Sequence, residues 1–116
     1  MRRIIFSLLL IASLFHISGC VTDGVRDSLL DVESYIMERP DSALAVLDSM
    51  DRTLLTTDRL KAHHALLHAM ALDKNYIDVD DDSIARVAVD YFSKHGPKKY
   101  EARARYYLGV SYYYAG

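Results

Sequence analysis

The spacing of apolar residues constrains the fold of this chain more than any other feature. After the acidic stretch DVDDDS, apolar residues recur at Ile84, Val87, Ala88, Tyr91 and Phe92. These are positions i, i+3, i+4, i+7 and i+8 of a helix with one apolar face. No segment of the chain alternates between apolar and polar residues for long enough to predict a strand. The sequence therefore predicts an all-α fold.

Prolines, glycines and capping residues divide the chain into five expected helices. The first carries an apolar stripe from Val25 to Ile36 and ends before Pro40, because proline disfavours helical geometry in the residue before it. Gly96 ends the fourth, since glycine suits a left-handed cap. Short loops favour antiparallel neighbours. The second helix is expected after a cap at Asp41 or Ser42, the third over 58–75 after a cap at Thr56 or Thr57, the fourth after a cap at Asp81, Asp82 or Ser83, and the fifth over 102–116.

The first 20 residues, MRRIIFSLLLIASLFHISGC, have the layout of an export signal. Two arginines precede an apolar run from Ile4 to Phe15, which is shorter than the about 20 apolar residues that a membrane span needs. The residues ISG then precede Cys20, and this pattern resembles the bacterial lipobox. The resemblance implies that residues 1–19 are a lipoprotein signal peptide and that Cys20 is lipidated. Cys20 is the single cysteine of the chain, which excludes an intrachain disulfide.

The residues from Cys20 onward are expected to form one small, mildly acidic domain. They carry all 16 acidic residues but only 12 of the 14 lysines and arginines, which leaves a net charge of −4. This charge gives no electrostatic case for binding nucleic acid or for a polybasic attachment to anionic lipid. We expect residues 20–26 to be a lipidated tether and residues 27–116 to be the helical domain.

Internal similarity explains the tyrosine-rich segment ARARYYLGVSYYYAG, residues 102–116. Its small residues, its Leu108-Gly109 pair and its tyrosines resemble the first helix of a tetratricopeptide repeat, although Arg105 stands where an aromatic residue is usual. The segment RPDSALAVLDSM resembles the turn and second helix of an earlier repeat. Helix starts near residues 25, 58 and 99 give spacings of about 33 and 41 residues, against 34 in the repeat family. With the lipobox, the chain is similar to tetratricopeptide lipoproteins of Gram-negative bacteria.

This resemblance implies a fold of antiparallel helix hairpins and a non-enzymatic, protein-binding scaffold without a cofactor. It places the chain in the cell envelope, anchored to a bacterial membrane, with the outer membrane favoured over the inner. Such scaffolds present a helix face to a protein or peptide. Tyr106, Tyr107, Tyr113 and Tyr114 are the candidate contacts, because aromatic residues are enriched at interfaces. The alternative is that these tyrosines contact a further helix.

In the repeat pattern, the turn to the next helix would come at Gly116, where the sequence stops. We therefore expect the last repeat to be incomplete, with an apolar face of Ala104, Leu108, Tyr112 and Ala115 left partly uncovered. Self-association through this helix, or fraying of it, would follow. In the alternative, the fifth helix packs back on the third and fourth. A non-functional fragment of a longer repeat lipoprotein is a further interpretation.

Three histidines in the third helix are the best candidates for a metal site. His64 and His68 are an i, i+4 pair that could in principle bind zinc, but Ala65 stands where an H-E-x-x-H motif has glutamate. We expect His64 and His68 to share a solvated face with Lys61, and His63 to lie at the edge of the core. Histidine-dependent metal binding remains the alternative function.

The aspartates at 78, 80 and 82 match the first three ligand positions of a calcium loop. Ser83 replaces the required glycine and Val89 falls at the position of the bidentate glutamate, which excludes an EF-hand. Capping of the following helix explains these acids. Since neither a G-x-S-x-G elbow nor a glycine-rich phosphate loop occurs, we expect no enzymatic activity.

Overall fold

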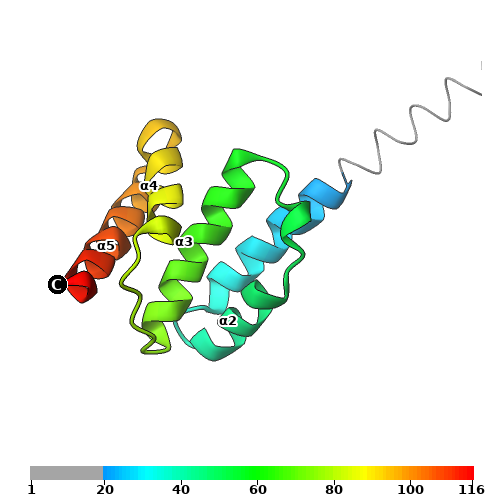
Figure 1. Cartoon of the computed structure of the whole chain (residues 1–116). Helices are drawn as coiled ribbons and strands as arrows, with labels where there is room; N and C mark the ends of the chain where they lie inside the picture. The colour runs from blue at the N-terminus through cyan, green and yellow to red at the C-terminus, as the bar shows by residue number, and fades with distance from the viewer. Residues whose placement is uncertain (1–19) are drawn as a thin grey trace, which may run out of the picture.

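The computed structural model describes residues 20–116, which are helical throughout apart from short loops (Figure 1). The signal-peptide prediction for residues 1–19 lies outside the described residues. The described chain contains five α-helices and no strand, which confirms the all-α prediction. None of these helices is long and apolar enough to cross a bilayer. The elements are a first helix whose described part is 20–35, α2 (Pro40–Ser49), the 3₁₀ turn η1 (Arg52–Leu54), α3 (Asp58–Lys74), α4 (Ser83–His95) and α5 (Lys98–Ala115).

Two of the expected helix ends are confirmed by their hydrogen bonds. The side chain of Thr57 accepts a hydrogen bond from the backbone N–H of Leu60 at 3.1 Å and caps α3. Gly96 has a φ of +65°, and its N–H donates to the carbonyl of Phe92 at 3.0 Å. A side chain with a Cβ rarely adopts this backbone conformation, so glycine ends α4 here.

The start of α2 differs from expectation, whereas one of the three candidate residues bonds to the start of α4. α2 begins at Pro40, and neither Asp41 nor Ser42 caps it. The predicted cap was wrong because proline is favoured at the first helical position, where its missing N–H would have no partner anyway. Before α4, Asp81 accepts from the N–H of Ser83 at 2.6 Å. Residues 20–26, expected as a tether, are helical and continue into the first helix without a break.

α3 is the central helix of the described chain. It packs against α2, α4 and α5, with α4 and α5 on one side and α2 and the first helix on the other (Figure 1). Its buried residues cover most of its circumference, as expected for a helix with neighbours on several sides. The core around α3 is completed by Phe92 of α4, by Leu29 of the first helix and by Ile36 in the turn that follows it.

The histidines of α3 are more buried than the sequence suggested. The prediction that His64 lies on a solvated face with Lys61 was wrong, because α2 packs on that side of α3. Only 4% of His64 is exposed, and its Nε2 lies 3.1 Å from the carbonyl oxygen of Leu47 in α2. His68 is half-buried beside α2, with its Nε2 3.2 Å from Oδ1 of Asp48. Burial lowers the pKa of both imidazoles.

α5 packs on α4 and α3 through a face that overlaps only in part with the one expected: Ala104 is buried and Leu108 packs against the core, but Tyr112 and Ala115 are exposed. Its buried residues are Tyr100, Ala104, Tyr107 and Ser111. Tyr112, which was expected in the apolar face, is half exposed, and its hydroxyl accepts a hydrogen bond from Arg86 of α4. The packing of α5 on α3 and α4 is the alternative arrangement considered above, and it leaves several tyrosines at the surface.

Candidate functional site

An open groove runs between the first helix, α3 and α5, three segments that are far apart in the sequence. Its exposed apolar side chains come from the first helix and from the middle of α5, and its cations come from the start of α5. We call this surface the inner groove. The residues that define it are Leu30, Glu33, Met37, Lys99, Arg103 and Tyr106.

The carboxylate of Glu33 joins the three helices that line the inner groove. Its Oε2 accepts a hydrogen bond from the hydroxyl of Tyr100 at 2.9 Å. Its Oε1 lies 3.4 Å from Nε2 of His63 and 4.0 Å from Nη1 of Arg103. The rings of His63 and Tyr100 stack with their centroids 5.3 Å apart. This cluster, Glu33, His63, Tyr100 and Arg103, fixes the relative positions of the helices at the groove.

Burial sets the protonation of this cluster. It lowers the pKa of His63, an effect that the negative charge of Glu33 opposes. Burial, and then the hydrogen bond to Glu33, raises the pKa of Tyr100 to about 12. At neutral pH His63 is therefore mainly neutral, and Tyr100 keeps the proton that it donates to Glu33.

The structure separates the four candidate contact tyrosines. Tyr106 is 63% exposed and lines the inner groove. Tyr107 is buried, and burial, with the negative charge of Asp73, raises its pKa to about 12. Tyr113 is 80% exposed, and Tyr114 is 41% exposed. These last two line a second open groove on α5, together with Tyr106.

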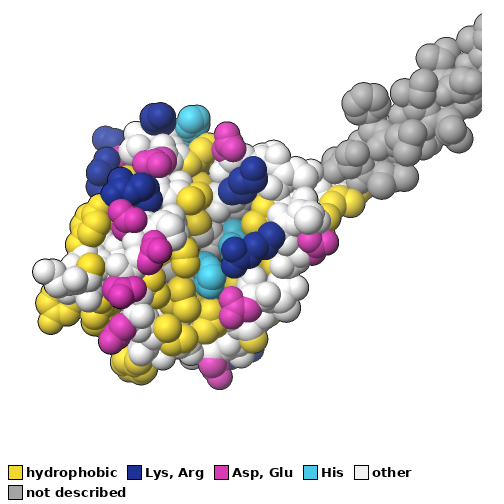
Figure 2. All heavy atoms as spheres, in the orientation of Figure 1, with side chains coloured by type: hydrophobic (Ala, Val, Ile, Leu, Met, Phe, Trp, Pro, Cys, Tyr) yellow, Lys and Arg dark blue, Asp and Glu magenta, His cyan; other side chains and the backbone are white. Residues whose placement is uncertain are grey.

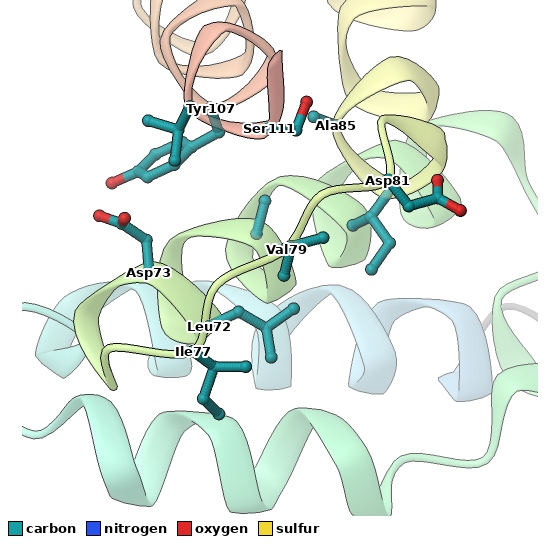
Figure 3. Close-up of a pocket in the computed structure, with 11 residues that line it drawn as sticks. Leu72, Asp73, Ile77, Val79, Asp81, Ala85, Tyr107 and Ser111 are labelled. Carbon is teal, nitrogen blue, oxygen red and sulfur yellow. The ribbon is translucent and has the colours of Figure 1, made fainter. Parts of the chain in front are cut away.

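A hollow between α3, α4, α5 and the loop before α4 is too small for a ligand. Tyr107, Ser111 and Val79 line it, and the carboxylate of Asp73 lies toward the hydroxyl of Tyr107 (Figure 3). Its volume of about 20 Å³ has room for roughly one water molecule. A cofactor pocket is typically larger by more than an order of magnitude.

The three histidines do not converge on one point. His63 faces Glu33 of the first helix, whereas His64 and His68 face α2, with their ring centroids 5.6 Å apart. Across residues 20–116, no three His, Cys, Asp or Glu side chains are placed to hold a metal ion. Figure 2 shows histidine beside lysine or arginine and acidic side chains on one face of the described surface. The geometry thus gives no support to the metal-binding alternative.

Comparison with known proteins does not assign the chain to a family. No family model, curated protein or solved structure matches it. The function therefore has to be inferred from the residues and geometry given above.

Sequence reasoning missed Glu33, the residue that organises the inner groove. Glu33 lies next to Val32 in the apolar stripe of the first helix, so a solvated position was the simplest interpretation. Its partners His63, Tyr100 and Arg103 are 30 to 70 residues away along the chain. No local spacing links residues at such separations, and a carboxylate beside a buried stripe was the one available signal.

Proposed function

We propose that this chain is a lipid-anchored, non-enzymatic helical scaffold that binds a protein or peptide in its inner groove. The observation that carries the proposal is the composition of that groove. Exposed Leu30, Met37 and Tyr106 lie beside the cations Lys99 and Arg103. Aromatic residues, methionine and arginine are the residue types that protein interfaces favour over the rest of a surface.

The role of Glu33 supports a binding surface rather than a catalytic one. A general acid or base has to be free to exchange a proton with a substrate. Glu33 instead accepts from Tyr100 and lies close to His63 and Arg103, and so it holds helices together. A rigid groove loses less conformational entropy when a partner binds.

The anchor in this proposal is the lipid expected on Cys20. Cys20 is exposed in the structure, so its thiol is accessible for modification. The ISG tripeptide before it and the short apolar run upstream support lipidation, and several acyl chains on one cysteine give stable attachment where one chain does not. The location that follows is the cell envelope, with the outer membrane favoured.

The tetratricopeptide resemblance supports the same proposal. In such repeats, the first helices of successive hairpins line a common face that receives the ligand. The repeat starts expected near residues 25, 58 and 99 lie in the first helix, α3 and α5, and these are the three helices that line the inner groove.

Site-specific photo-crosslinking tests the proposal. A photoreactive phenylalanine analogue at Tyr106 of the full chain, expressed in Gram-negative cells, should give discrete protein adducts. The same analogue at Val87 is the matched control and should not give those adducts, because Val87 is 45% exposed on α4, although the sequence had placed it on the apolar face of that helix. Ala102→Trp, which places a large ring in the inner groove, should reduce the Tyr106 adducts. Identical adducts from both positions, or no effect of Ala102→Trp, would contradict binding in the groove.

A further inference from the structure

A second apolar groove lies at the end of the molecule where Cys20 is found. It is formed by the start of the first helix, the end of α2 and η1, and we call it the anchor-side groove. The apolar residues that define it are Val21, Val25, Val46, Met50, Leu54 and Leu55. In Figure 2, hydrophobic side chains lie beside the point where the described chain starts.

The rim of the anchor-side groove is unusually apolar for a free surface. Val21 is 44% exposed, Val46 is 37% exposed and Leu54 is 39% exposed. These three come from different elements and line one groove, so they form a continuous patch rather than scattered exposed residues. Contiguous patches of this kind mark contacts with proteins or membranes.

The distance between this patch and the lipid attachment point is short. Val21 directly follows Cys20, and residues 20–35 form one helix without an intervening flexible linker. A rigid helix that starts at the anchor cannot hold the domain away from the bilayer as an extended linker would. The surface around Cys20 therefore has to lie at the level of the lipid headgroups.

We propose that the anchor-side groove rests on the lipid bilayer, with Val21, Val46 and Leu54 inserted at the headgroup and acyl boundary. This inference rests on the proposed lipidation of Cys20 and adds a specific orientation to it. Half-exposed apolar side chains gain from burial at that depth. The net charge of −4 over residues 20–116 provides no attraction to anionic lipid, so the contact is hydrophobic and insensitive to salt.

This docking leaves the inner groove open to a partner. Val21 of the anchor-side groove and Leu30 of the inner groove are separated by about two and a half helical turns, and so they face opposite sides of the first helix. When the side that carries Val21 faces lipid, the side that carries Leu30 faces the aqueous phase. The bilayer contact thus orients the proposed binding surface.

The chain contains no tryptophan, so single-tryptophan variants can report on this contact without background. Leu54→Trp and Val46→Trp place the probe in the anchor-side groove, and Met37→Trp, at a 61% exposed residue beyond the other end of the first helix, is the matched control. Each lipidated full-chain protein is reconstituted into phosphatidylcholine vesicles whose acyl chains carry bromine, which quenches nearby indole fluorescence. Circular dichroism checks that each variant is folded.

We expect blue-shifted emission and strong quenching for Leu54→Trp and Val46→Trp, with neither effect for Met37→Trp. The quenching should persist at high salt. If the variants float with the vesicles but none of the three is quenched by the brominated chains, the docking is wrong and the anchor is retained. This outcome would also be expected if a second copy or a soluble protein covered the groove. If the proteins do not float with the vesicles, the anchor itself is wrong, and the docking with it.

Discussion

Gly109 gives a sharp test of how α5 is packed. It lies in the middle of α5, and a Cβ built there would meet no atom within 4 Å. Within the described residues, no neighbouring helix uses the space that the missing Cβ leaves. Glycine inside a helix destabilises it relative to alanine by roughly 0.5–1 kcal/mol. Gly109→Ala should therefore stabilise the protein by about that amount.

Urea unfolding followed by helical circular dichroism measures this gain directly. For a domain of this size, 0.5–1 kcal/mol corresponds to a rise in Tm of roughly 2–8 °C. Gly96→Ala is the matched control: because Gly96 has a φ of +65° and a ψ of −172°, a region essentially restricted to glycine, an added Cβ should destabilise the protein by about 1–3 kcal/mol. If Gly109→Ala destabilises the protein instead, another surface packs closely against α5 in solution, and the packing of α5 inferred here is wrong.

Three further predictions concern stability. Burial lowers the pKa of all three α3 histidines, so below about pH 6.5 the unfolded chain binds more protons than the folded chain. We therefore expect a Tm that is constant above this pH and falls as the pH drops through it. A Tm that rises on acidification would contradict this sign. Thr57→Ala should cost about 1 kcal/mol by removing the α3 cap, whereas the exposed neighbour Thr56→Ala should change stability by less than about 0.5 kcal/mol in the same urea titration. Phe92→Ala should cost about 3–5 kcal/mol, because the ring is fully buried; a loss below about 1 kcal/mol would mean that the core is not packed as described.

The helices could be predicted because their signals are local. The stripe from Ile84 to Phe92, the cap at Thr57 and the stop at Gly96 each depend on residues within a few positions of one another. Such spacings determine whether a segment is helical and where it ends. They do not determine which neighbour covers each face, and for this reason the burial of His64 against Leu47 was not foreseen.

The buried face of α5 was predicted only in part, for a different physical reason: Ala104 and Leu108 pack inward, whereas Tyr112 is half exposed. Tyrosines occur on most sides of this helix, so its apolar periodicity is weak and several faces fit equally well. Ser111 is buried although it is polar, and its hydroxyl donates to the carbonyl of Leu108 at 2.7 Å within the same helix. Because this bond satisfies the hydroxyl, Ser111 can be buried without an outside partner.

The organisation of the inner groove depends on contacts between distant residues, which a single sequence does not reveal. The Glu33 carboxylate and the Tyr100 hydroxyl meet across 67 residues of chain. The anchor, in contrast, is entirely a matter of local sequence, because the ISG tripeptide and Cys20 are adjacent. The inner groove is therefore inferred from contacts in the structure and the anchor from local sequence, and each needs its own measurement.

The central claim is that a lipid on Cys20 fixes this scaffold to a membrane. Mass spectrometry of the protein purified from the membranes of a Gram-negative host tests it most directly. We predict a mature chain that begins at Cys20 and carries a diacylglyceryl group, and we predict that the Cys20→Ser variant stays uncleaved and unmodified. A mature chain that begins elsewhere, or an unmodified thiol on Cys20, would contradict the claim.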